Sequence, residues 1–300
     1  MLHIFNGDST RLSFLTQALP GATAVWNEVL CEGPCTLPVS DDSWVARRDA
    51  FFSAYFHLPP GEYAARFRQE WAEIQTWREH EEVVLWFEYD LFCQINLLGL
   101  LSYFDSQALG STRLSLVCLG TWPGYEGLVA LGEIDPVHYA ALLDSRIPVS
   151  TADLRRAADC WACYCGPDHR PLAGLAADWP LMPYLPAAVQ AHYRRFPSRQ
   201  TGLTAIEARI LDQIAAGHTD TPSLIGALLR DQQPYGFGDL QYLQYLRAMA
   251  PLIGERAPHR IPTVATNRGL ASLVFGGCAQ GAFVWDEAAH RLIPGQDAAR

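Results

Sequence analysis

The chain has 300 residues, of which 49% are hydrophobic and 18% are charged, and its formal net charge is −10. This composition is typical of a soluble globular protein, and the length allows two domains or one large domain with an appendage. The negative charge argues against a general nucleic-acid binder, because phosphate contacts need clustered positive charge. All 22 lysine-plus-arginine positions are arginine, which excludes mechanisms that need a lysine, such as Schiff-base or P-loop chemistry.

The sequence predicts neither a targeting segment nor a membrane span. The N-terminus lacks a basic region followed by a long apolar run, so no signal peptide is expected. The most apolar segment, residues 91–101, contains Gln94 and Asn96 and is too short to cross a bilayer. Eight cysteines in a chain of this length do not form the framework of a small disulfide-rich domain. We therefore expect a cytoplasmic protein with reduced thiols and no membrane partner.

The chain begins with a short apolar run, residues 2–5, that ends in a polar turn and is followed by a helical pattern. This arrangement predicts a strand, a tight turn and a helix N-terminus. Ligands of open α/β sheets bind at the carboxyl ends of strands, and a helix N-terminus attracts anions. We expect an anionic ligand to contact the turn, with Asp8 and Ser9 as catalytic candidates and with substrate-binding roles for Asn6, Gly7 and Thr10.

More strands follow, at residues 23–26, 82–87 and 114–119. The segments between them have helical patterns, and Asp135-Pro136 is typical of a further helix N-terminus. Strands separated by helices form βαβ units with right-handed crossovers. Residues 1–148 are therefore predicted to form an α/β domain with a mostly parallel, Rossmann- or flavodoxin-like sheet.

The second half of the chain has a different pattern. Residues 149–200 look helical and are interrupted by prolines, which indicates a helical bridge. Beyond residue 201, three predicted helices precede short strand candidates at 272–275, 282–285 and 291–293. Three helices followed by a β-hairpin is the order of a winged helix. Residues 201–300 are therefore predicted to form a winged-helix-like C-terminal domain.

The charge of this C-terminal domain argues against DNA binding. Residues 201–300 contain eight arginines and nine acidic residues. DNA readout requires several basic or amide side chains on the recognition helix, within a basic surface. The helix in that position, residues 239–249, carries one basic residue, Arg247, beside Gln241, Tyr242, Gln244 and Tyr245. We interpret the domain as a packing, homo-oligomerisation or lid module, and DNA contact stays as the alternative.

In a parallel sheet, the ends of the first three strands bring several polar side chains to one edge. Carboxylates that converge with amide and hydroxyl groups could hold a divalent cation, position a sugar, or act as acid and base. We expect Glu88 and Asp90 to take the acid–base or metal roles, and Glu28, Glu32 and Gln94 to bind substrate. In the alternative interpretation, Asp90 and the residues at the first turn cap helices, and the glutamates are solvated.

His3 lies within the first predicted strand. A histidine in a strand is often a satisfied core or rim residue, and its position close to the strand-end turn makes it a catalytic candidate as well. Both interpretations are open at the level of the sequence.

Three motifs, taken together and in this order, are similar to those of a bacterial family classified as domain of unknown function 1835 (DUF1835). They are the segment from His3 to Ser9, the segment from Glu28 to Pro34 that contains Glu32-Gly33-Pro34, and the segment from Leu85 to Gln94. The resemblance covers the first part of the chain well and the C-terminal helices more loosely. The family has no established activity, so the resemblance supports the position of the site and leaves the reaction open.

Gly7-Asp8-Ser9 after a first strand also resembles the opening block of the SGNH and GDSL hydrolases, in which that serine is the nucleophile. Such an enzyme needs a histidine and an aspartate, and Asp135 and His138 match the closing Asp-x-x-His pattern. The intermediate blocks of these hydrolases are missing from the sequence, and Asp135 is already expected to cap a helix. The triad is therefore a secondary hypothesis.

Two groups of cysteines have spacings that suit a metal. Cys160, Cys163, Cys165 and His169 are spaced as zinc ligands can be, although the first two lie in a helical pattern rich in alanine, where thiols pack well. Cys31 and Cys35 flank a Gly-Pro turn and could pair or bind a metal. Buried or free thiols are the alternative in both cases.

These observations favour an uncharacterised cytoplasmic enzyme, a transferase or hydrolase, that acts on a small polar or anionic substrate at the strand-end pocket. The alternative is a ligand-sensing regulator whose winged-helix module contacts DNA or a partner protein. The sequence does not define a cofactor, although the carboxylates make a divalent metal a candidate.

Overall fold

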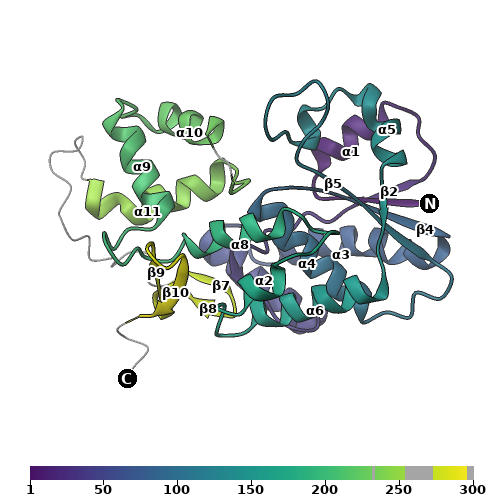
Figure 1. Cartoon of the computed structure of the whole chain (residues 1–300), viewed down its shortest axis with the longest axis horizontal. Helices are drawn as coiled ribbons and strands as arrows, with labels where there is room; N and C mark the ends of the chain where they lie inside the picture. Colours follow the sequence, from purple (N-terminus) through teal and green to yellow (C-terminus); the bar gives the residue numbers. More distant parts are fainter. Residues whose placement is uncertain (232–233, 254–272, 296–300) are drawn as a thin grey trace.

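The computed structural model of the chain describes residues 1–231, 234–253 and 273–295. A five-stranded sheet organises its N-terminal part, with the strand order β2-β1-β4-β5-β6 (Figure 1). The strands are β1 (Leu2–Phe5), β2 (Ala22–Val25), β4 (Glu82–Glu88), β5 (Arg113–Leu119) and β6 (Ile147–Pro148). The first four are parallel and β6 is antiparallel to β5. The predicted α/β class and mostly parallel sheet are confirmed.

The strand order places a topological switch point between β1 and β4. The chain passes from β1 to β2 on one side and later returns to β4 on the other side of β1. In sheets of this kind the connections diverge at the switch point and leave a crevice outside the carboxyl ends of the two strands. The polar turns after β1 and β4 lie at this crevice.

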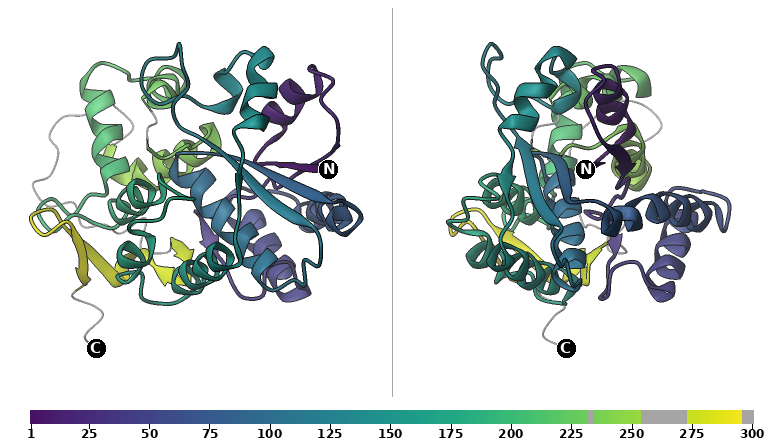
Figure 2. Two further views of the ribbon diagram at one scale, coloured as in Figure 1. Left: turned by 45° about the vertical axis from the view of Figure 1, so that its right-hand side comes forward. Right: turned by 90° about the vertical axis from the view of Figure 1, so that its right-hand side faces the viewer.

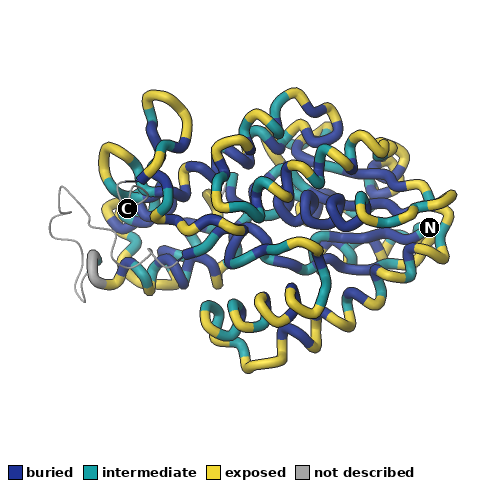
Figure 3. The backbone as a smooth tube through the Cα atoms, turned by 90° about the horizontal axis from the view of Figure 1, so that it is seen from below, coloured by how far each residue is buried: buried dark blue, intermediate teal, exposed yellow. Residues whose placement is uncertain are grey.

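Helices cover both faces of the sheet. On one face, α1 (Asp8–Leu15) and α5 (Tyr139–Asp144) pack on an aromatic core in which the Phe14 and Trp86 ring centroids are 5.5 Å apart. On the other face lie α3 (Glu62–Gln75) and α4 (Leu91–Asp105), and Figure 1 shows the two layers on opposite sides of the strands. In Figure 3 the strands beside the N-terminus run through the interior in dark blue.

The helix α4 is the most deeply buried helix of this unit, because thirteen of its fifteen residues are buried. It packs against α6 (Thr151–Cys165), and the Trp161 side chain of α6 lies beside Gly99 of α4. The shorter helices α7 (Leu172–Ala176) and α8 (Leu185–Tyr193) continue this layer. Residues 149–200, predicted as a bridge, thus form a second helical layer over the sheet.

A further helix and a short strand complete the N-terminal half. The helix α2 (Asp42–Tyr55) packs beside α3 and begins at Asp41, whose carboxylate accepts a hydrogen bond from the Trp44 backbone N–H. The strand β3 (Gly33–Pro34) lies in the Glu32-Gly33-Pro34 motif and belongs to a separate small sheet.

The C-terminal part contains the three predicted helices, α9 (Ala205–Ala215), α10 (Thr221–Arg230) and α11 (Asp239–Ile253). They lie beyond the end of the sheet at which β1 and β4 terminate (Figures 1 and 2). Among the described helices, none has the length and apolar character that a bilayer crossing requires.

The winged helix is not confirmed. An antiparallel hairpin is present, β9 (Phe283–Asp286) with β10 (Arg291–Pro294). However, β7 (Val274–Gly276) pairs in parallel with β3 and in antiparallel with β8 (Cys278–Ala279). The chain after the three helices therefore returns to the N-terminal half. Residue 272, the first of the predicted 272–275 strand, lies outside the described residues.

Four of the side chains that could read DNA on α11 are buried, and Arg247 is exposed. Tyr242 and Tyr245 are fully buried, and Gln241 and Gln244 are less than 10% exposed. A recognition helix must present such side chains to the base edges in the major groove. This face of α11 packs inward instead.

Glu82, the first residue of β4, forms an ion pair whose contribution to stability can be tested. Its carboxylate accepts hydrogen bonds from Arg146 Nε (2.8 Å) and the Ser115 hydroxyl (2.7 Å), and the bond from Arg146 holds the pKa of Glu82 at about 2, below the ordinary 4.5. A depressed pKa stabilises the fold above about pH 4.5, and this contribution is lost as the pH falls toward 2. We expect Glu82→Gln to lower the free energy of unfolding at pH 7 and to make it less dependent on pH between 4.5 and 2.

Urea denaturation at pH 7 and pH 3 measures this effect, with Glu81→Gln as the control because the neighbouring Glu81 is exposed. An equal loss of stability at both pH values in Glu82→Gln would contradict the ionic role assigned to Glu82.

Candidate functional site

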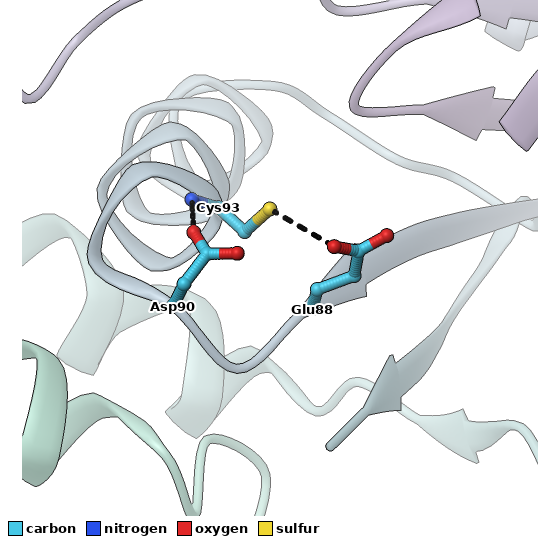
Figure 4. Close-up of side chains that lie close together, drawn as sticks. All are labelled: Glu88, Asp90 and Cys93. Carbon is cyan, nitrogen blue, oxygen red and sulfur yellow. Dashed lines mark hydrogen bonds between the residues drawn. The ribbon is translucent and has the colours of Figure 1, made fainter. Parts of the chain in front are cut away.

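Glu88, Asp90 and Cys93 form a compact corner at the carboxyl end of β4. Glu88 is the last residue of the strand, and Asp90 and Cys93 belong to the N-cap and first turn of α4. One oxygen or sulfur atom from each of the three lies within 4.8 Å of the other two. Figure 4 shows the three side chains facing a common space, with the second Asp90 oxygen pointing toward Glu88. Asp90 and Cys93 are buried, and Glu88 is partly exposed.

A backbone N–H group donates a hydrogen bond to each of the two carboxylates of this Glu88–Asp90–Cys93 corner. The Leu131 N–H donates to Glu88 Oε1 (2.9 Å), and the Cys93 N–H donates to Asp90 Oδ1 (2.8 Å). The other oxygen of Glu88, Oε2, faces the Cys93 sulfur at 3.9 Å. Each carboxylate is therefore fixed through one oxygen, which leaves its second oxygen to face the corner.

The Cys93 sulfur accepts a hydrogen bond from Asn6, which follows β1. The Asn6 Nδ2 group lies 3.0 Å from Cys93 Sγ, and Asn6 Oδ1 accepts from Asn96 Nδ2 at 2.8 Å. The amide of Asn96 is oriented by the backbone, because its Oδ1 accepts from the Leu30 N–H and its Nδ2 donates to the Glu28 carbonyl. This relay leaves Asn6 only one orientation, with its NH₂ group toward the sulfur.

Burial controls the ionisation of the corner. Burial, together with the nearby Asp90 carboxylate, raises the pKa of Glu88 to about 8. Burial also raises the pKa of Asp90, although the Cys93 N–H acts in the opposite direction, and it raises the pKa of the Cys93 thiol. Three negative charges do not coexist in so small a buried volume. The corner therefore holds protons at neutral pH unless a positive ion compensates the charge.

A segment of the C-terminal half covers this corner. The Pro234 carbonyl accepts from the Leu91 N–H (2.9 Å), and the Tyr235 carbonyl accepts from the Phe92 N–H (3.1 Å). Gly236 has a φ of +68° and lies directly against the Asp90 carboxylate, where a Cβ atom would clash. These contacts satisfy the first N–H groups of α4 and bury Asp90.

The second half of the site is the N-terminus of α1. No side chain caps this helix, and a Cβ atom on Gly7 would meet nothing within 4 Å. The first N–H groups of a helix have no intrahelical acceptor, so an uncapped end favours an anion. Ser9 is exposed here, and its hydroxyl lies beside Gly132, next to the Leu131 N–H that holds Glu88.

Asp8 and Arg11 share the first turn of α1. Asp8 is exposed and lies 3.8 Å from the Arg11 guanidinium. The Arg11 Nε atom is buried and has no hydrogen-bond partner in the described part of the chain. Arg11 thus adds a half-buried cation, near Asp8, to the first turn of the helix.

The structure brings together one part of the predicted site. Asn6, Gly7, Asp8, Ser9, Glu88 and Asp90 lie at the carboxyl ends of β1 and β4. Gln94 belongs to the same region, because its Nε2 donates to the Glu88 carbonyl at 2.6 Å. Thr10 is buried in the first turn of α1.

Glu28 and Glu32 are not directed at this site. Glu28 accepts a hydrogen bond from Tyr63 and pairs with Arg48 Nη2 at 3.3 Å, and all three side chains are buried. Glu32 pairs with Arg195 at 3.3 Å. Their partners come from α2, α3 and the segment after α8, so both glutamates neutralise buried arginines in the interior, a role that requires no ligand.

His3 also lies apart from the site. Its Nε2 atom is 3.0 Å from the Pro20 carbonyl, and the Trp86 indole N–H lies 3.1 Å from Nδ1. Burial lowers the pKa of His3, and the ring packs 4.5 Å from Phe14 in the aromatic core. A neutral imidazole that donates to Pro20 and accepts from Trp86 satisfies both bonds. The core interpretation accounts for His3 without a catalytic role.

The alternative constellations are not assembled in the described residues. Asp135 accepts a hydrogen bond from the Val137 N–H, and no hydrogen bond joins Ser9 to Asp135 or His138. His169 bonds to His192 (2.8 Å) and to the Tyr164 carbonyl (2.7 Å), and it does not form a metal-ligand group with the cysteines at 160, 163 and 165. Cys31 and Cys35 are buried free thiols.

Two functional groups were missed at the level of the sequence. Cys93 lies three residues after the cap Asp90, in the first turn of an apolar helix, and that spacing is a usable signal. Arg11 lies three residues after Asp8 on the first helix, at the spacing that places two side chains on one face. The contact of residues 234–236 with α4 has no local signal, because more than 140 residues separate the two segments.

A cavity of about 330 Å³ opens beside the end of β2, the strand next to β1. Asn27 and Val29 line it from the N-terminal side, Leu240 and Gln241 from α11, and Arg66 gives its wall a positive charge. The volume is sufficient for a small organic molecule. The segment after β2, the end of α2 with the residues that follow it, and α11 thus border the cavity together.

The contribution of the Gly236–Asp90 contact to stability can be tested by substitution of the glycine. We expect Gly236→Ala to lower the free energy of unfolding by about 1–3 kcal/mol more than Gly61→Ala. Gly61 has a similar φ of +86°, but a Cβ atom there meets nothing within 4 Å, so it isolates the cost of the backbone conformation. Urea denaturation measures both variants. Equal losses would show that the carboxylate contact does not matter.

No protein-family model matches this chain, and a search of curated proteins also finds no match. The resemblance to the DUF1835 family therefore rests on the three sequence motifs. Two of these, from His3 to Ser9 and from Leu85 to Gln94, supply the corner and the open helix end that lie side by side at the switch point. The third, around Glu32, lies in the interior.

Proposed function

We propose that the chain is an enzyme, of the transferase or hydrolase class, that acts on a small anionic molecule at the edge between β1 and β4. One observation carries this proposal: an uncapped helix N-terminus and the buried Glu88–Asp90–Cys93 corner adjoin at the switch point. The Asn6–Cys93 hydrogen bond of 3.0 Å joins the two halves directly.

The helix end is suited to hold the anionic group. The first N–H groups of α1 offer partial positive charge, and the partly exposed Arg11 guanidinium offers a full positive charge. Gly7 lets a ligand approach the backbone closely. The Arg11 guanidinium offsets part of the negative charge of the exposed Asp8, and the ligand approaches from the side of Ser9. Ser9 then supplies a hydroxyl to a phosphate, sulfate or carboxylate.

The Glu88–Asp90–Cys93 corner is suited to the reacting group. Its side chains are oriented by the Leu131 and Cys93 N–H groups and by Asn6, and they lie where little water enters. Fixed polar groups in such a place stabilise developing charge more strongly than mobile ones in water.

The DNA-binding form of the regulator alternative gains no support from α11, because its two glutamines and two tyrosines are buried and Arg247 is its one basic residue. All eight cysteines are free, which supports a reducing compartment such as the cytoplasm. Homo-oligomerisation and membership of the DUF1835 family remain predictions.

A thermal-shift screen tests the binding half of the proposal. We expect at least one phosphorylated or carboxylated metabolite to raise the Tm by about 5 °C at roughly 100 times its Kd, because a ligand that binds only the folded state stabilises it by mass action. Arg11→Gln should reduce this shift at least by half, and Arg68→Gln, which changes an exposed arginine on α3, should keep it.

Turnover of the compound found in this screen tests the second half. Glu88→Gln should bind the compound and lower its turnover by a factor of about 100 or more, the range expected for loss of a group that acts on the reacting atoms. Unchanged turnover in Glu88→Gln would contradict the role of the corner. Binding that is equal in Arg11→Gln and wild type would contradict the assigned anion site.

A further inference from the structure

We infer that Glu88, Asp90 and Cys93 form a binding site for one divalent cation of the zinc type, held by one sulfur and two carboxylate oxygens with at least one position open. The inference rests on the strand-end site proposed above and identifies the cation that binds at its Glu88–Asp90–Cys93 corner. It is drawn from the donor set, the geometry and the supporting hydrogen bonds.

The donor set selects the class of cation. Magnesium and calcium prefer ligand sets made only of oxygen, whereas a cysteine sulfur favours softer ions such as zinc or cobalt(II). Three protein ligands are typical of catalytic zinc sites, which keep the fourth position for water or substrate. The corner supplies three ligands from six consecutive positions, Glu88 to Cys93, where β4 ends and α4 begins.

The distances are close to those that a tetrahedral ion requires. With zinc–sulfur and zinc–oxygen bonds of about 2.3 and 2.1 Å, the sulfur and oxygen ligands lie about 3.6 Å apart. Cys93 Sγ and Glu88 Oε2 are 3.9 Å apart, and all three ligand atoms lie within 4.8 Å of one another. Small side-chain rotations would bring the three atoms onto one ion without a change in the backbone.

The supporting hydrogen bonds are those that orient metal ligands. Groups outside the ligand set fix Glu88 through Leu131 and Cys93 through Asn6, and the helix backbone fixes Asp90. Such outer contacts position ligands and tune their affinity. In each carboxylate the outer contact takes one oxygen, which leaves the other for the ion.

Gln94 provides an independent observation. Its side chain is fully buried, and Nε2 donates to the Glu88 carbonyl at 2.6 Å, beside the corner. Its Oε1 atom has no hydrogen-bond partner in the described part of the chain. A buried amide oxygen without a partner is costly, and a water molecule on a bound cation is a donor that would satisfy it.

Cobalt(II) is the probe that tests this inference on the full chain, because a cobalt–thiolate bond gives a near-ultraviolet charge-transfer band. After treatment with a chelator, the wild type should bind one cobalt(II) ion per chain with this band, and zinc should displace it. Cys93→Ser should lose the band and bind zinc at least ten times more weakly. Cys118→Ser should keep the band and the zinc affinity. Cys118 lies on β5, close to Gln94 of α4, and does not belong to the ligand group.

Glu88→Gln and Asp90→Asn provide a second measurement if Cys93→Ser does not fold, as judged by circular dichroism. Each should weaken zinc binding at least tenfold in a titration. The absence of one-to-one binding by the folded wild type, or an unchanged band in Cys93→Ser, would overturn the inference.

The result of the metal-binding experiment can be distinguished from the result of the tests of the proposed function. Metal binding is read without substrate, and the anion screen is read on the chelator-treated chain. Anion binding and turnover without metal binding would overturn this inference alone. Metal binding by a chain that binds no anionic compound would support this inference and contradict the proposed function.

Discussion

The N-terminus of α4 is the constraint on which the rest of the structure depends. Because this helix is buried along almost its whole length, its first N–H groups cannot reach water and must find acceptors within the protein. Asp90 accepts from the Cys93 N–H, and the carbonyls of Pro234 and Tyr235 accept from Leu91 and Phe92. The same interactions close the core, attach the C-terminal half and bury one carboxylate of the candidate site.

This arrangement couples the site to the C-terminal helices. Gly236 lies on Asp90, and α11 follows directly with Leu240 and Gln241 in the wall of the cavity beside β2. A change in the position of α11 would therefore alter both the cover of the Glu88–Asp90–Cys93 corner and the space for a ligand. On the opposite side, Asn96 and Asn6 connect the middle of α4 to the Cys93 sulfur. The helix thus positions the corner through its N-terminus and through Asn96.

Local patterns predicted much of this structure. The apolar run at 82–87, the caps at Asp90 and Asp135 and the turn at Asn6-Gly7 all act within a few residues, so the strands, helix ends and strand-end edge could be predicted. The pairing of β7 with β3 and the contact of Gly236 with Asp90 join distant segments by tertiary packing, which leaves no periodic signal. Glu28 and Glu32 were predicted as ligand contacts because the sequence does not show that Arg48 and Arg195 reach them.

The central claim is that a small molecule binds where β1 and β4 end. Amide hydrogen exchange of the full chain, with and without a compound that raises its Tm, tests this most directly. The account expects slower exchange in residues 7–11, 88–94 and 129–133, because these segments carry the open helix end, the corner and the loop that holds Glu88. Protection confined to α9, α10 or the β9–β10 hairpin, with no change in these three segments, would contradict it.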